Sequence, residues 1–554
     1  MMEISSTQHP KSVCTTQKNG SVTGKILFAF SGAAMTLLLS QGGSLLYIGA
    51  GVLLSFIVCM IVAFHFDLPN AALRAPSPLP LALAIVLAGF SALLYRTTFD
   101  GVSKKVIVPF LASSPLSFLA SAARAALPNV VCVLSLFALF VWFYLFSDRA
   151  LQFVRRWVAC SCRAERLYLL IGFVLATAAI AIVYSRTTAF FGGAPYDVVY
   201  TTDSGNLMST NSYFYVNAYE NDIRQPLFAV FSMPFAALSM LLSKVLFFVP
   251  NAYPMVIACV QAGLLLLGFT LLARVLRLTG ADRVLFLLLL TVSYSTLLFL
   301  FTIEQYVFSV FWILVLLYAW HEKRENRTML FVAATGSLLT SGMFFPLLFT
   351  EKSTGNRIRT LLAAGLAFLA AFVVFGRVPL LNRAIQTARD LASFTGQKIS
   401  FDERAMQFFT FVSVCFVRPA AGVDLTTYPH ASYQMIAASD VNWLGITLLS
   451  LSAVSAALHR KDPHMRVFSL WAGFSVVLLL LVGWGAAENG MTLYTLYFSW
   501  AFAALLYMLL QRVVKKNSLL RYGIAAATIA ALACVNTLGI IDLVRFAAMY
   551  YPVA

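Results

Sequence analysis

Residues 128–185 read PNVVCVLSLFALFVWFYLFSDRALQFVRRWVACSCRAERLYLLIGFVLATAAIAIVYS and decide the class of fold. Two apolar runs, Pro128–Ser147 and Leu167–Ser185, are each long enough to cross the roughly 30 Å hydrocarbon core of a bilayer as a helix. Between them lie five arginines, Arg149, Arg155, Arg156, Arg163 and Arg166. Because Lys and Arg are retained on the cytoplasmic side, this basic loop predicts two spans joined inside the cell.

Similar apolar runs recur along the whole chain. Of its 554 residues, 60% are hydrophobic and 11% are charged, whereas about 25% are charged in a soluble domain. Alternation of apolar runs with Lys/Arg clusters predicts an all-α polytopic membrane protein with about 15 transmembrane helices. The excess of 39 Lys and Arg over 22 Asp and Glu therefore indicates sidedness in the membrane rather than binding to nucleic acid.

The charge map predicts three parts. They are a cytoplasmic tail (1–25), an accessory bundle of four transmembrane helices (26–166) and a core (167–554) with long outer loops at 186–253 and 376–440. Within the first outer loop, Pro226–Val249 is expected to lie along the membrane surface and to break at Pro234. A second break is expected in the short apolar pair Met329–Thr340 and Phe344–Phe349, as is typical of helices that line a cavity.

The first outer loop contains the strongest candidates for chemistry. A carboxylate at the membrane surface, among aromatic and small polar residues, suits a general base that deprotonates a hydroxyl beside a lipid-linked donor. Asp203 is the first candidate for this role and Asp197 is the second. The alternative interpretation is that Asp203-Ser204-Gly205-Asn206 is a solvated turn, because all four residue types favour turns.

The order of features around this loop is similar to that of a known superfamily. The acidic loop leads into Arg224-Gln225-Pro226-Leu227-Phe228, and Val275-Leu276-Arg277-Leu278-Thr279-Gly280 follows at the inner end of the next span. This order resembles the GT-C superfamily of integral-membrane glycosyltransferases, which use polyprenyl-phosphate sugars. The resemblance covers residues 167–554 loosely and leaves the first 166 residues as an extra bundle.

The resemblance implies roles for individual residues. Asp203 matches the catalytic base, Arg224 matches the basic residue near the donor phosphate, and Glu304-Gln305-Tyr306 matches the acid of the next outer turn. Glu304 is alternatively a helix-terminal carboxylate at the interface. The chain has Asp203-Ser204 where some branches of the family have Asp-Glu, which leaves acceptor handling at this position open.

Two further groups are predicted on the same side of the membrane. Glu488 and Asn489, followed by Tyr494, Tyr497 and Trp500, are typical either of a sugar platform or of an interfacial aromatic belt. Arg418 and His430 lie in the second outer loop, where basic residues should be scarce. Arg418 is therefore a candidate to bind the donor phosphate, unless it belongs to a solvated segment paired with nearby acids.

These residues predict a glycosyltransferase that moves a sugar from a polyprenyl-phosphate donor to an extracytoplasmic glycan, lipid or protein acceptor. One alternative is a lipid-linked glycan polymerase or ligase, in which His430 would matter more than Asp203. Another is a transporter or flippase, which requires buried charge midway along its spans. No cofactor or metal site is predicted, although some relatives use a divalent metal. A bacterial plasma membrane is implied by the resemblance alone.

Overall fold

The computed structural model describes most of the chain. The described residues are 22–40, 45–66, 77–102, 112–113, 115, 117–192, 198–216, 224–322, 327–338, 354–378, 380, 389, 395, 399–427, 429–436, 440–486 and 490–553. Helices account for most of these residues, and two short strands form the one sheet among them.

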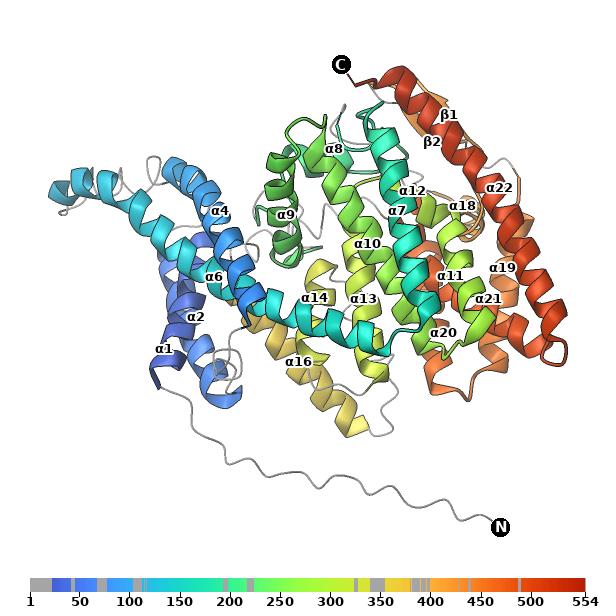
Figure 1. Cartoon of the computed structure of the whole chain (residues 1–554), viewed down its shortest axis with the longest axis horizontal. Helices are drawn as coiled ribbons and strands as arrows, with labels where there is room; N and C mark the ends of the chain where they lie inside the picture. Colours follow the sequence, from blue (N-terminus) through green and yellow to red (C-terminus); the bar gives the residue numbers. More distant parts are fainter. Residues whose placement is uncertain are drawn as a thin grey trace, which may run out of the picture.

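The helices and strands follow one another along the chain as labelled in Figure 1. The N-terminal elements are α1 (Val22–Leu39), α2 (Leu45–Phe66), α4 (Pro78–Val102), η2 (Ser117–Leu119) and α6 (Ala120–Cys160). The later elements are α7 (Arg163–Tyr184), α8 (Ser204–Ser209), α9 (Phe228–Val245), α10 (Ala252–Val275), α11 (Gly280–Val292), α12 (Tyr294–Phe301), α13 (Gln305–His321), α14 (Arg327–Ser337), α16 (Thr354–Val374), α18 (Phe401–Val414), β1 (Ala421–Asp424), β2 (Ser432–Met435), α19 (Trp443–Leu458), α20 (Pro463–Ser475), η3 (Val476–Leu481), η4 (Gly490–Tyr494), α21 (Thr495–Val513) and α22 (Ser518–Tyr550).

The lengths and composition of these helices identify the class of protein. Within the described residues, 10 helices are long and apolar enough to cross a membrane, and the bent pair α11–α12 raises this number to 11. An all-α polytopic membrane protein is thus confirmed. The finer prediction of about 15 crossings with two large outer loops is not tested by these lengths.

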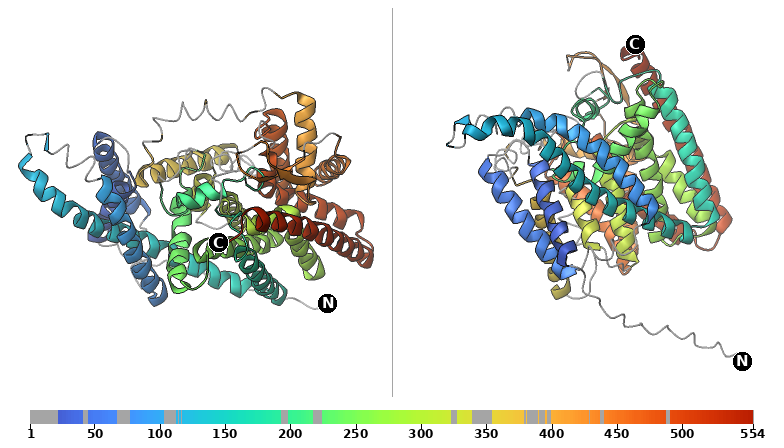
Figure 2. Two further views of the ribbon diagram at one scale, coloured as in Figure 1. Left: turned by 90° about the horizontal axis from the view of Figure 1, so that it is seen from above. Right: turned by 60° about the vertical axis from the view of Figure 1, so that its left-hand side comes forward.

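The N-terminal helices form a group at one side of the molecule. α1, α2, α4 and α6 lie together in Figure 1 and in both views of Figure 2. A helix from the later part of the chain joins them, because Thr36 Oγ1 in α1 donates to the carbonyl oxygen of Val374 at the end of α16 at 2.8 Å. The segments that follow α16 and α1 also lie close together, because a Cβ atom at Gly376 would lie 2.8 Å from the backbone nitrogen of Ser40. The bundle and the core therefore share an interface.

The arginine-rich segment differs from the prediction of a basic loop. α6 has 41 residues and continues through Arg149, Arg155 and Arg156 to Cys160, so only Ser161 and Cys162 separate it from α7. At 1.5 Å per residue the helix is about 60 Å long, roughly twice the thickness of a hydrocarbon core. The arginines belong to helix ends because Arg favours helix once the chain has left the apolar region.

Opposite charges are buried together at this arginine-rich end. Glu165 in α7 is fully buried, and its carboxylate contacts Arg274 of α10 at 2.6 Å and Arg283 of α11 at 3.1 Å. Burying one carboxylate between two guanidinium groups compensates for the loss of hydration, which an unpaired charge does not recover. The three helices are thereby joined at the end that the sequence predicts to be cytoplasmic.

Helix α9 also differs from the prediction. It runs without a break through Pro234, and it is one of the helices that qualify as membrane spans. Ten of its residues, mostly in the first half, are buried, and it packs against α4, α10 and α14. A proline removes one helix hydrogen bond, and here packing on three sides compensates for it. The predicted break at Pro234 is therefore wrong, whereas the predicted position of this helix along the membrane surface is not tested by its length and composition.

The predicted second outer loop contains ordered elements. α18 buries Phe408, Phe411 and Val412, and it lies so close to α19 that a Cβ atom at Gly445 would overlap the carbonyl oxygen of Phe409. β1 and β2 then pair antiparallel, with Ala421 opposite Met435. The hairpin and α8 lie near the upper end of the molecule in Figure 1, whereas the turn from α6 to α7 lies near the lower end.

The segment that follows α7 is joined to the end of α22. The backbone N–H of Thr188 donates to the carbonyl oxygen of Tyr551 at 2.9 Å, and Thr187 Oγ1 donates to the same oxygen at 2.7 Å. The hydroxyl of Tyr551 in turn donates to the carbonyl oxygen of Ala431, just before β2. The end of α22 thus connects the segment that follows α7 to the β1–β2 hairpin.

Candidate active site

The loop that contains Asp203 is held by the hairpin. Tyr433 of β2 donates its backbone N–H to Val198 at 2.9 Å, and Tyr200 donates back to Tyr433 at 2.7 Å. The chain then turns so that Asp203 occupies the N-cap position of α8, but its carboxylate makes no capping bond within that helix. The predicted alternative of a solvated turn is wrong, because the neighbouring side chains of Thr202 and Ser204 are buried.

Glu304 lies against Asp203, 101 residues away in the chain. Its Oε1 accepts a hydrogen bond from the backbone N–H of Asp203 at 2.6 Å, and its Oε2 accepts one from the N–H of Gln305 at 3.3 Å. Glu304 therefore caps α13 and fixes the Asp203 loop at the same time. With 2% of its surface exposed, it is a buried carboxyl and not a group at the lipid interface.

Arg224 is positioned by the docking of α9 on α14. Leu227, which precedes α9, donates its backbone N–H to Gly336 of α14 at 2.9 Å. A Cβ atom at Gly336 would lie 2.6 Å from Leu227 Cβ, so only glycine permits this approach. Arg224 is three residues earlier, and its positive charge acts on the carboxyl groups of both Asp203 and Glu304.

Burial and mutual repulsion control the protonation of the two carboxyls. Burial raises the pKa of Asp203, and the charge of Arg224 partly opposes this shift. Burial raises the pKa of Glu304 well above its usual value, and the nearby Asp203 charge raises it further. Two carboxyls that repel each other in this way do not both ionise readily. Burial and the Asp203 charge both favour the protonated form of Glu304, whereas the charge of Arg224 favours ionisation of Asp203.

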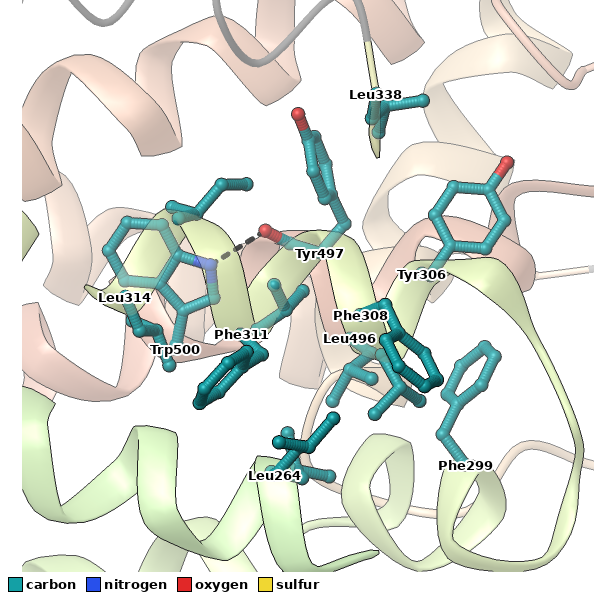
Figure 3. Packing of buried hydrophobic residues seen from close by; sticks show 14 of the residues in the cluster. Leu264, Phe299, Tyr306, Phe308, Phe311, Leu314, Leu338, Leu496, Tyr497 and Trp500 are labelled. Atoms are coloured by element: carbon teal, nitrogen blue, oxygen red, sulfur yellow. Dashed lines mark hydrogen bonds between the residues drawn. The ribbon is translucent and has the colours of Figure 1, made fainter. Parts of the chain in front are cut away.

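An aromatic wall adjoins the carboxyl pair. Tyr306, in the first turn of α13, packs edge-on against Tyr494 with ring centroids 5.5 Å apart, and Trp484 Nε1 donates to the Tyr494 hydroxyl at 2.7 Å. Figure 3 shows the hydroxyls of Tyr306 and Tyr497 pointing away from the hydrophobic side chains beneath them. Trp500 is buried, as are Tyr306 and Tyr497, and its Nε1 donates to the Tyr497 carbonyl at 2.8 Å. It is part of the core and belongs neither to a sugar platform nor to an interfacial belt.

The structure therefore brings together Asp203, Arg224, Glu304 and Tyr306, which are candidate site residues from separate parts of the sequence. Asp197, Glu488 and Asn489 lie outside the described residues. His430 is in the turn that joins β1 to β2, and it is not among the groups that shift the pKa of Asp203 or Glu304.

Arg418 belongs to a second group of residues. Its Nη1 contacts Asp542 of α22 at 2.9 Å, and its backbone N–H donates to Asn536 Oδ1 at 2.9 Å. Tyr200, Tyr294 and Tyr433 surround it. These tyrosines and Asp542 were not predicted from the sequence as site residues. One signal was available, because Asp542 is the one acidic residue in the long apolar helix α22.

Within the described part of the chain, no three His, Cys, Asp or Glu side chains gather closely enough to hold a metal ion. That the protein needs no metal or other cofactor stays a prediction. Comparisons of the chain with protein-family models, with curated proteins and with solved structures find no match. Function is therefore inferred from the chemistry of the site.

Proposed function

We propose that the protein is a glycosyltransferase that moves a sugar from a polyprenyl-phosphate donor to a hydroxyl group of an extracytoplasmic acceptor. The observation that supports this most strongly is the buried carboxyl pair, Asp203 and Glu304, beside the positive charge of Arg224. Such a site offers a base for a hydroxyl group and a cation for a departing phosphate.

The reaction would be a single displacement. The acceptor oxygen forms a bond to the anomeric carbon of the sugar while the bond from that carbon to the phosphate oxygen breaks. Asp203 takes the proton of the acceptor hydroxyl, and the polyprenyl phosphate leaves with the bonding electrons and is stabilised by Arg224. Attack from the face opposite the phosphate inverts the anomeric configuration.

Glu304 acts in this scheme as a positioning residue. Its carboxyl accepts the N–H of Asp203 and thereby holds the loop at α13. Because Glu304 keeps the proton that the pair shares, Asp203 is free to ionise and to act as the base. Tyr494, which packs edge-on against the buried Tyr306, adds polar and aromatic surface next to the pair, where a sugar ring would bind.

The proposal places this site on the extracytoplasmic side, in what the resemblance suggests is a bacterial plasma membrane. Support comes from the distribution of charge. The Asp203 loop lies toward the end of the molecule opposite the turn between α6 and α7 (Figure 1), where arginines gather. By the positive-inside rule the arginine-rich end faces the cytoplasm.

Transfer of radiolabelled sugar from polyprenyl phosphate by the purified full-length protein tests the proposal. We expect Asp203→Asn to lower the rate by about 10²–10⁴-fold, the usual contribution of a general base. Asp402→Asn is the matched control, because Asp402 is exposed in the first turn of α18. An Asp203→Asn variant as active as wild type would overturn the proposal. If His430→Ala were then inactive, a polymerase or ligase would be favoured.

A further inference from the structure

A pocket separate from the carboxyl pair lies between the loop that contains Tyr200, the hairpin and the C-terminal helix α22. Its volume is about 300 Å³. The side chains that contribute to its chemistry are those of Tyr200, Tyr294, Tyr433, Arg418 and Asp542. Gly539 of α22 also lines the pocket. Its size is at the lower end of the roughly 300–1,000 Å³ typical of small-molecule sites, which suits one or two sugar rings.

The phenol groups are fixed by the backbone. Tyr200 has a left-handed conformation with φ 53°, which is costly for a residue with a side chain and is typical of functional sites. Its carbonyl accepts a hydrogen bond from Gln434 Nε2 at 2.8 Å, and its hydroxyl is hydrogen-bonded to that of Tyr294. The conformation is thus held on both sides, and it directs the ring into the pocket.

The position of Tyr294 depends on a bend. α11 and α12 meet at an angle of 59°, and Tyr294 is the first residue after the break. A break leaves backbone N–H groups without a helical partner. Here the N–H of Tyr294 donates to the carbonyl oxygen of Phe416 at 3.1 Å, which attaches the bend to the segment that contains Arg418.

The polar end of the pocket is an ion pair packed over a glycine. Arg418 and Asp542 are 36% and 47% exposed, so their charges remain accessible to a ligand. A Cβ atom at Gly539 would lie 2.6 Å from Arg418 Cδ, so the arginine side chain runs directly across the surface of α22. Asp542 also pairs with Arg545 at 3.7 Å, but Arg545 does not line the pocket, so the lining itself carries one cation and one anion and offers strong donors and acceptors without a net charge.

We propose that this pocket binds an uncharged sugar unit of the acceptor. The rings of Tyr200, Tyr294 and Tyr433 line the pocket but are largely buried, so the accessible hydrogen-bond partners for the hydroxyls of a sugar are the side chains of Arg418 and Asp542. Tyr200 and Asp203 are three residues apart in one loop, so the pocket is next to the site of transfer. The assignment of this sugar to the acceptor rests on the proposed function. The proposal that the pocket binds a sugar does not depend on that function.

Saturation-transfer difference NMR on the purified full-length protein tests the pocket. The probes are the methyl glycosides of glucose, galactose, mannose and N-acetylglucosamine, and the protein is held in phosphatidylcholine nanodiscs because sugar detergents would compete. We expect binding of at least one glycoside to wild type and to Asp203→Asn. Gly539→Ala, which displaces Arg418, and Asp542→Asn are each expected to weaken binding about tenfold. Gly523→Ala is the control, because a Cβ atom there meets open space on the same helix.

Each outcome bears on the pocket in a defined way. Absence of saturation for all four glycosides overturns the proposal, and so does equal binding by wild type, Gly539→Ala and Asp542→Asn. Loss of binding in Asp542→Asn with binding retained in Gly523→Ala supports it. Failure of the proposed function is distinguishable from failure of the pocket. In that case sugar transfer would be absent from wild type or unchanged in Asp203→Asn, irrespective of whether the methyl glycosides bind.

Discussion

The backbone N–H of Asp203 donates a hydrogen bond of 2.6 Å to Oε1 of Glu304. This bond joins the loop after α7 to the first turn of α13, so that two carboxyls from distant parts of the chain occupy one buried site. Their protonation is then linked to each other and to the charge of Arg224. Substitution of Arg224 or Glu304 should therefore change the protonation of the remaining carboxyl groups.

Arg224→Gln should change both the rate and the pH dependence of transfer. The positive charge of Arg224 lowers the pKa of Asp203, so its removal raises that pKa. Because the base must be ionised, the acidic limb of the kcat/KM profile should move to higher pH. The rate should fall by about 10²–10³-fold through loss of phosphate stabilisation. Arg224→Lys keeps the charge and should hold the limb near its wild-type position. A profile unchanged in Arg224→Gln would contradict the assignment.

Glu304→Gln should stabilise the protein at alkaline pH. A carboxyl whose pKa is raised by folding contributes stability below its unfolded pKa of about 4.3, and this contribution is lost as pH rises through the folded pKa. Glutamine stays neutral, so the Tm of the variant should exceed that of wild type increasingly as pH rises. Each pKa unit corresponds to about 1.4 kcal/mol. The exposed carboxyl of Glu403 provides the control, Glu403→Gln. A Tm difference independent of pH would show that Glu304 is not held protonated.

Gly336→Ala should destabilise the fold and impair the site. The added methyl group meets Leu227 Cβ at 2.6 Å, and overpacking of this kind typically costs about 1–3 kcal/mol. Displacement of Leu227 also moves Arg224 away from the carboxyls. Thermal unfolding and transfer rate should therefore both decrease. Gly365→Ala in α16, where a Cβ atom meets open space, should be neutral or stabilising. Equal stability of the two variants would refute the close packing of α9 on α14.

Single-cysteine labelling should show the two ends of the molecule on opposite sides of the membrane. Ser209 ends α8 and is exposed, and Lys461 is exposed just before α20. In a background without other cysteines, an impermeant maleimide should label Ser209→Cys in intact cells. It should label Lys461→Cys only after permeabilisation. The reverse pattern would place the carboxyl pair on the cytoplasmic side and remove the basis of the proposed function.

Hydropathy predicted most apolar helices because their length and composition are set by the bilayer. It did not predict where helices end in polar sequence. α6 extends past Ser147 through the arginines to Cys160 because Arg favours helix, and α9 passes through Pro234 because packing against its neighbours compensates for the proline. An apolar run with an internal proline is compatible with a broken surface helix until its neighbours are known.

The candidate site was predicted in part. Asp203, Arg224 and Glu304 were recognised from the order of motifs, and the structure places them together. The pocket beside α22 was not predicted, for a physical reason. Tyr294 and Asp542 are isolated polar residues in apolar sequence, and they meet only because α12 bends and α22 returns beside it. No local pattern encodes such a meeting.

The contacts that Tyr551 makes with Thr188 and Ala431 have a consequence for biogenesis. The ribosome releases the Asp203 loop long before it has made α22, so a membrane-inserted nascent chain lacks the strap that connects this loop to the hairpin. Assembly of this end of the molecule is thereby delayed until the last helix has been translated. A polypeptide stalled before that point would be threaded through the bilayer and yet be without activity.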